Sequence, residues 1–233
     1  MKRFRIFLAL ILLAGTSAAP AANPPQSAQK WTLQGVLSMM DKSAKDFHSL
    51  TANLEHIKYT DVVKDTSTES GEIFVERDEK MRIEFAKPDP RTILRTGDSF
   101  FIYTPKINRV EEFNLGKNRE LVDQYILLGF GTKSENVLKS YAMELKDEVM
   151  LDDKKTVLLE LTPKSEQVLK QITRIQMWVD EASWLPVQQK FYEAGSGDYL
   201  LFHYTKMLKN LKISGSKFKQ DWPKGVARVK PRG

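Results

Sequence analysis

The stretch from Gly71 to Pro105 constrains the fold most, because its apolar and polar residues alternate in short runs separated by turns. Met81, Ile83 and Phe85 alternate with charged residues, the period-2 pattern of a strand with one buried and one solvated face. Turn-forming residues separate the runs at Asp78–Glu79, Pro88–Pro90 and Gly97–Asp98. The stretch therefore predicts four antiparallel strands joined by tight turns.

Further patterns extend this meander into one large sheet. Strand-like runs lie at 47–63, 108–114, 143–151, 156–161, 173–180, 186–192 and 199–208, and 66–70 is interpreted as a polar turn. Apolar spacing predicts one helix over 32–45 and two short helices within 121–141. We expect a mainly β, α+β fold with one antiparallel sheet of about 10–11 strands, which must twist and curl. Its concave face either holds a cavity beneath the helices or is packed solid by them.

The N-terminus has the layout of a secretory signal peptide. A basic start and an apolar stretch are followed by small residues around Ala21. The apolar stretch is shorter than the roughly 20 residues that cross a bilayer as a helix. We expect a cleaved signal peptide over 1–21, a flexible lead-in over 22–30 and a single domain over 31–233.

The chain contains no cysteine, which excludes disulfides and a thioether-linked lipid. We therefore expect a soluble periplasmic protein that is not itself lipidated. The net charge of +6 is unevenly distributed, because the residues from Lys206 onward include nine basic side chains and one acidic one. This tail suits an anionic surface or partner, or it is simply a solvated C-terminus. Export separates the protein from nucleic acid, so we expect no nucleic-acid partner.

The sequence contains no affirmative signal of catalysis. His48, His56 and His203 do not have metal-ligand spacing, and a G-x-S-x-G motif is absent. Gly129-Phe130-Gly131 lacks the third glycine of a dinucleotide-binding loop and is interpreted as a helix stop. We predict a binding protein rather than an enzyme, with no metal and no cofactor.

Several segments resemble one family in their order and spacing. They are Phe47–Ala52, Gly71–Arg77, Met81–Phe85, Ile93–Pro105, Leu159–Lys164 and Phe218 with Trp222–Val226. Together they are similar to the periplasmic outer-membrane lipoprotein carriers (LolA-like proteins). The resemblance implies an unclosed β-barrel with a helical lid over a hydrophobic cavity. It also implies a monomeric carrier that shuttles lipoproteins from an inner-membrane ABC exporter to an outer-membrane acceptor, with only transient membrane proximity.

The resemblance implies the residues of the site as well. The arginine that holds the lid closed in the family falls on Arg77, although Asp78 replaces the usual proline and Met81 a usual aromatic residue. The candidate cavity residues are Leu54, Ile73, Val75, Met81, Ile83, Phe85, Phe101 and Tyr103. The candidate lid residues are Leu33, Leu37, Met40, Ile126 and Leu127.

Two other binding functions remain open at this point. One is a carrier of a different lipid, such as a glycolipid. The other is a regulatory protein that senses lipoproteins, a class that shares the half-barrel and usually carries an additional C-terminal domain.

Overall fold

The computed structural model describes residues 30–77, 80–116 and 128–231. The expected signal peptide, nearly all of the expected lead-in, the turn at 78–79 and the first part of the helical region predicted within 121–141 lie outside the described residues. Within the described ranges, no helix is both long and apolar enough to cross a membrane.

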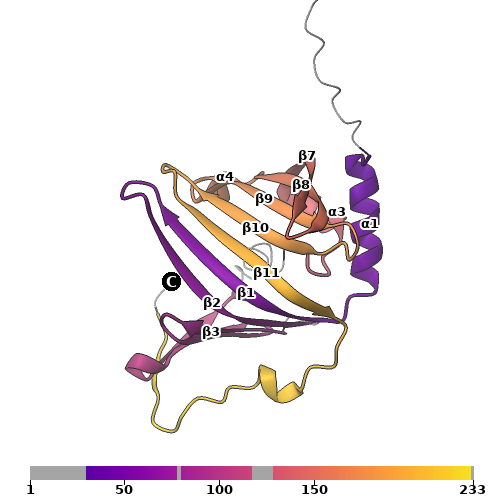
Figure 1. Cartoon of the computed structure of the whole chain (residues 1–233). Helices are drawn as coiled ribbons and strands as arrows, with labels where there is room; N and C mark the ends of the chain where they lie inside the picture. Colours follow the sequence, from indigo (N-terminus) through magenta and orange to yellow (C-terminus); the bar gives the residue numbers. More distant parts are fainter. Residues whose placement is uncertain (1–29, 78–79, 117–127, 232–233) are drawn as a thin grey trace, which may run out of the picture.

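Twelve strands form one sheet in the order β12-β6-β5-β4-β3-β2-β1-β11-β10-β9-β8-β7. The strands are β1 (Ser49–Thr60), β2 (Asp65–Glu76), β3 (Lys80–Lys87), β4 (Arg91–Thr96), β5 (Ser99–Thr104), β6 (Arg109–Asn114), β7 (Tyr141–Leu151), β8 (Lys154–Pro163), β9 (Ile172–Asp180), β10 (Pro186–Glu193), β11 (Tyr199–Lys209) and β12 (Ala227–Val229). The sheet curls without closing, and all pairs are antiparallel except β12 with β6 (Figure 1). The predicted unclosed antiparallel sheet is confirmed, with β12 as the strand that the sequence pattern missed.

The turn between β1 and β2 lies elsewhere than the sequence predicts. Residues 66–70 belong to β2 and pair with β1, as Ser67 does with Lys58. The turn instead falls at 61–64, so Val62 and Val63 are at its tip rather than inside a strand. A run of polar residues has no alternation to identify it as a strand, and here the backbone pairing with β1 determines its conformation.

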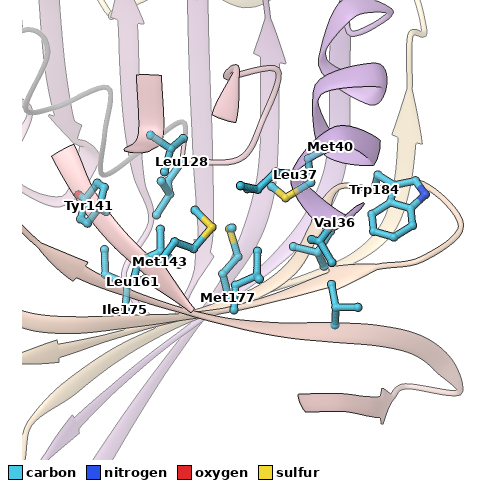
Figure 2. Close-up of a cluster of buried hydrophobic side chains, with 14 of the residues drawn as sticks. Val36, Leu37, Met40, Leu128, Tyr141, Met143, Leu161, Ile175, Met177 and Trp184 are labelled. Carbon is cyan, nitrogen blue, oxygen red and sulfur yellow. The ribbon is translucent and has the colours of Figure 1, made fainter. Parts of the chain in front are cut away.

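Among the described residues, three helices and two short 3₁₀ turns accompany the sheet. They are α1 (Leu33–Lys45), α3 (Ser134–Ser140), α4 (Glu166–Leu169), η1 (Pro105–Ile107) and η3 (Gly215–Phe218). α1 matches its predicted span, and Thr32 caps it, since its Oγ1 accepts a hydrogen bond from the Gly35 amide at 3.1 Å. The buried stripe of Val36, Leu37 and Met40 faces the sheet (Figure 2).

The described part of the core forms three clusters. One lies between α1, α3 and strands β7–β10, and a second lies on the same inner face over β1–β3. The third lies on the outer face, where Leu94, Phe101 and Val110 are packed beneath Trp222 and Val226. In β3 the inward Met81, Ile83 and Phe85 alternate with the outward Arg82 and Glu84, which confirms the predicted alternation.

The C-terminal segment (residues 210–226) runs back over the outer face (Figure 1). Arg82 holds it there. Its guanidinium donates to the carbonyl oxygens of Lys217 and Lys219 at 3.2 and 3.3 Å and to the Asp221 carboxylate at 3.1 Å. Part of the basic tail is therefore packed against the protein rather than solvated.

Candidate functional site

A cavity of about 610 Å³ lies on the inner face, between strands β1–β3 and β9–β11. Its walls are formed by Leu54, Ile73, Ile83, Lys170, Gln171, Ile172, Gln189, Phe191, Glu193, Ala194, Leu200, Phe202 and Tyr204. These residues come from the two halves of the sequence. The curl of the sheet is what brings them together.

The walls are mainly aliphatic and aromatic. Leu54, Ile73 and Ile83 are three of the residues predicted from the sequence, and the structure brings them together at the cavity. Val75, Met81 and Phe85 are buried in the cluster next to them but do not line the cavity. The sequence prediction missed the opposite wall, formed by Ile172, Phe191, Leu200 and Phe202. The alternation of Leu200, Phe202 and Tyr204 was the available signal.

Phe101 and Tyr103 require a correction. They lie in the outer-face cluster, where their rings are 6.4 and 5.1 Å from that of Trp222. Their neighbour Phe100 packs against the inner cluster instead. Strand parity explains the difference, because adjacent residues of β5 face opposite sides of the sheet.

Two buried polar side chains form the inner end of the cavity. The Tyr204 hydroxyl donates to Gln189 Oε1 at 2.9 Å, and Gln189 Nε2 donates to the Leu128 carbonyl oxygen at 2.9 Å. Burial raises the pKa of the Tyr204 phenol, so this group stays neutral and acts as a hydrogen-bond donor. The pair is satisfied internally and adds no charge to the apolar space.

The Leu128 contact holds a tight turn against the sheet. Gly129 has φ +82°, and a Cβ there would lie 2.6 Å from Pro186 Cγ, so only glycine fits. Phe130 is buried, with its ring perpendicular to that of Tyr204 at 5.2 Å. The sequence reading made Gly129–Gly131 a helix stop, but the helix itself falls outside the described residues. The structure shows a turn that positions Phe130 next to the inner end of the cavity.

The outer end of the cavity lies at the edge formed by α4 and the β10–β11 turn. Lys170, Gln171 and Glu193 line the cavity there, and Lys170 and Gln171 are exposed. Charged lining residues are thus confined to this rim. An apolar interior with a charged rim suits an amphiphile whose tail enters first.

The helix α1 covers the other end of the inner face. Leu37 and Met40 pack in the cluster that contains Met143, Met177 and Trp184, and Leu33 lies at its periphery (Figure 2). None of the residues that line the cavity comes from α1. The resemblance implied a helical lid directly over the cavity, and α1 does not form one over this cavity. The candidates Ile126 and Leu127 lie outside the described residues.

Arg77 contacts the C-terminal end of α1. Its Nη2 donates to the Ala44 carbonyl oxygen at 2.7 Å and to that of Lys45 at 3.3 Å. A cationic donor at this end satisfies carbonyl groups that have no partner within the helix and interacts favourably with the helix dipole. Arg77, the residue expected to hold the lid closed, is thus hydrogen-bonded to the helix that was predicted over 32–45.

A polar cluster lies beside the aromatic wall. The Glu69 carboxylate contacts His56 Nδ1 at 2.9 Å and Arg91, whose Nη2 is 2.7 Å from it, and the His56 ring stacks on Phe202 at 4.6 Å. Burial raises the pKa of Glu69, but the hydrogen bonds from Arg91 and His56 outweigh it and leave that pKa below its ordinary value. Glu69 is therefore a charged, paired carboxylate. No group of three or more potential metal ligands occurs within the ranges that the structure covers.

Comparison with known proteins identifies relatives of the fold. An uncharacterized conserved protein from Thermus thermophilus, known from a crystal structure, has 11% sequence identity to this chain. The match covers 85% of this chain and 98% of that chain with a TM-score of 0.56. MucB is 13% identical, and the match covers 83% of this chain and 64% of the MucB chain with a TM-score of 0.50. A LolA superfamily protein from Nitrosomonas europaea is 16% identical, with 83% and 100% covered and a TM-score of 0.43. Among curated proteins, none matches the sequence.

A protein-family model described as "Uncharacterized protein" matches residues 77–218, more than half of the chain. This span begins at Arg77 and includes both walls of the cavity except for β1 and β2. The chain belongs to this family, and its open, curled antiparallel sheet is the fold that it shares with the Thermus thermophilus protein and with MucB.

Proposed function

We propose that this protein carries acylated molecules and holds an acyl chain in the cavity between β1–β3 and β9–β11. One observation supports this most strongly: a cavity of about 610 Å³ has apolar walls, a neutral inner end and charged residues only at its rim. The volume falls within the roughly 300–1,000 Å³ typical of small-molecule sites. Acyl chains are the common biological ligands that match such a lining.

The energetics of acyl burial favour a carrier with a limited cavity. Each buried methylene contributes about 0.8 kcal/mol, so complete burial of several chains would exceed the practical limit of roughly 18–21 kcal/mol for non-covalent binding. Release would then be too slow for transport. A cavity that is open at one end and buries only part of its cargo keeps binding reversible.

The proposed cargo is a lipoprotein, and the proposed route runs through the periplasm. The signal-peptide layout of 1–21 and the sequence resemblance to LolA-like carriers support this. In this proposal a monomer receives lipoproteins from an inner-membrane ABC exporter and delivers them to an outer-membrane acceptor. The proposal includes no chemical reaction. In it, Gln189 and Tyr204 form a hydrogen bond with each other and serve as neutral lining of the cavity.

Arg77 is assigned the role of holding α1 in place during this cycle. Arg77 is exposed, its hydrogen bond to the Lys45 carbonyl oxygen is exposed and its hydrogen bond to that of Ala44 is half-buried, so water can replace the guanidinium when the contact breaks. Because α1 packs against the cluster next to the cavity, its displacement would change the space available to the cargo. This provides a route to cargo release.

A cavity-filling substitution tests the proposal. Leu200→Trp places a larger ring in the cavity, whereas Leu201→Trp changes the adjacent residue, which faces the other side of β11. We expect Leu200→Trp to weaken binding of a fluorescent stearate about tenfold or more, since overpacking typically costs about 1–3 kcal/mol. Leu201→Trp should bind like the wild type. Equal affinities for all three proteins would contradict the assignment of this cavity.

The identity of the cargo requires a separate measurement. Mass spectrometry of ligands that copurify with the protein from the periplasm distinguishes acylated peptides from glycolipids or other lipids. Acylated lipoprotein fragments would support the lipoprotein carrier, and a glycolipid would replace it with the alternative lipid carrier. The fold shared with MucB keeps a regulatory binding protein as the second candidate, although the match covers only 64% of MucB.

A further inference from the structure

The turn between β1 and β2 exposes two apolar side chains. Val62 and Val63 are 88% and 68% exposed, the highest values among the large apolar residues that the structure describes. Ile107, in the turn between β5 and β6, is 53% exposed. Isolated exposed apolar residues are common, but two adjacent valines at the apex of a hairpin form a protruding apolar tip.

This valine tip (Val62 and Val63) lies at the same end of the molecule as the rim of the cavity. β1, β3 and β5 run in the same direction through the antiparallel meander, so their turns fall at one edge of the sheet (Figure 1). The Asp61 amide donates to Asp198 Oδ1 at 2.8 Å, which joins the tip to the β10–β11 turn. That turn begins at Glu193 and Ala194, and both residues line the cavity.

The lysines within these two apolar turns, Lys64 and Lys106, are paired with carboxylates. Lys64 Nζ is 2.6 Å from Asp61 Oδ1, and Lys106 Nζ is 3.4 Å from Asp89 Oδ1. These lysines therefore bring little uncompensated positive charge to the surface. Contact through this end should depend on apolar burial and only weakly on salt concentration.

The shape of the tip favours a membrane over a protein as its partner. A stable protein interface buries roughly 1,200–2,000 Å² and requires a complementary surface. Two side chains on a projecting turn supply much less area. A bilayer requires no complementary shape, because apolar side chains can enter the boundary between headgroups and acyl chains.

We propose that the valine tip inserts into the surface of a phospholipid bilayer and brings the rim of the cavity to the membrane. An acyl chain can then move between the bilayer and the cavity without crossing bulk water. The inference rests on the proposed carrier function, since it explains how the same cavity is loaded and emptied. Partial burial of two valines gives weak and reversible docking.

A site-specific label tests the insertion directly. The chain has no cysteine, so Val63→Cys provides a unique position for an environment-sensitive NBD label. The matched control is Met150→Cys, which is 62% exposed and adjoins the β7–β8 turn at the opposite end of the sheet. With vesicles of phosphatidylethanolamine and phosphatidylglycerol, the label at position 63 should shift its emission to shorter wavelength, and the label at position 150 should not. No shift at position 63, or equal shifts at both positions, would overturn the proposal.

A functional test uses the double variant Val62→Ser with Val63→Ser. The rate of transfer of a fluorescent stearate from vesicles to the protein should fall about tenfold, because the apolar contact is lost. Met150→Ser should transfer at the wild-type rate. Wild-type transfer by the double variant, or transfer that collapses at high salt in the wild type, would contradict docking through the valines.

The affinity for the same stearate in vesicle-free buffer separates the two proposals. The double variant should retain wild-type affinity there, because neither valine lines the cavity. If the wild type fails to bind stearate in vesicle-free buffer, the carrier function is contradicted. In that case the labelled Val63→Cys protein alone tests docking: an emission shift at position 63 that is absent at position 150 supports it, and no shift or equal shifts overturn it.

Discussion

Single polar contacts position the elements around the cavity. Gln189 connects Tyr204 to the turn at Leu128, and Arg77 connects β2 to the end of α1. Each contact brings a side-chain donor to a backbone carbonyl oxygen of a neighbouring element. Apolar packing provides most of the stability, while these contacts determine which parts of the chain meet.

Substitution of Arg77 tests its role in positioning α1. Arg77→Leu should lower the free energy of unfolding by about 1 kcal/mol and accelerate amide exchange in the last turn of α1, because the carbonyl groups of Ala44 and Lys45 lose a donor. It should also change the rate at which a bound fluorescent stearate is released to vesicles.

Two further variants provide the comparison for Arg77. Arg77→Lys keeps a cationic donor at the end of the helix and should restore part of the exchange protection. Lys80→Leu removes a neighbouring exposed cation that pairs only with Glu76 among the contacts described, and it should leave α1 unaffected. Unchanged exchange and release in Arg77→Leu would remove its proposed role.

The limit of sequence-based prediction is visible in β5. Ile73 and Ile83 lie in strands whose alternate residues are polar or charged, so period 2 assigns them to the inner face. Phe100, Phe101, Ile102 and Tyr103 are all apolar, and alternation cannot say which pair faces inward. The outer face of β5 is also buried, because the C-terminal segment covers it. Which residues of β5 face inward therefore becomes clear only from the three-dimensional structure.

The C-terminal segment acts as a strap across the outer face. Lys217 Nζ contacts Glu84 Oε2 at 2.9 Å, and Arg82 contacts both Glu84 and Asp221. Burial raises the pKa of Glu84, but the hydrogen bonds from Lys217 and Arg82 outweigh it and leave that pKa below its ordinary value of 4.5. Glu84 therefore stabilises the strap in its ionised form.

Attachment of this segment should depend on pH. Because the pKa of Glu84 is lower in the folded state, its contribution is present above pH 4.5 and is lost as the pH falls through the folded-state pKa. We expect amide exchange in the C-terminal segment (residues 210–226) to accelerate over that acidic range in the wild type.

The variant Glu84→Gln isolates this effect. Its strap should exchange faster than that of the wild type at neutral pH, and much of the acid-dependent change should disappear. Glu166→Gln, an exposed carboxylate in α4, serves as the control and should follow the wild type. An identical pH profile in Glu84→Gln and the wild type would show that other groups hold the segment.

At the level of elements, the sequence predicts the strands whose apolar and polar residues alternate. It misses the segments that become strands only by pairing with a neighbouring strand. α1 and eleven strands follow from periodicity and capping. β12 is only three residues long and exists through pairing with β6, and the polar first half of β2 exists through pairing with β1. Neither segment has a local pattern that indicates a strand.

Across the whole molecule, the inner face is solid at one end and hollow at the other. The sequence left a solid core and a cavity as alternatives, and the structure contains both. α1 fills the end around Met177 and Trp184, while a cavity of about 610 Å³ lies toward α4 and the β10–β11 turn. Alternation identifies the residues of a face, but the filling of that face depends on where the helices lie.

The most direct test of the account is a crystal structure of the protein with a fatty acid that carries bromine at the end of its chain. The anomalous signal of bromine marks the position of the tail without ambiguity. The account predicts a peak inside the cavity, among Leu54, Ile73 and Phe202. A cavity closed by the protein's own side chains, with bromine absent or bound only at the surface, would contradict it.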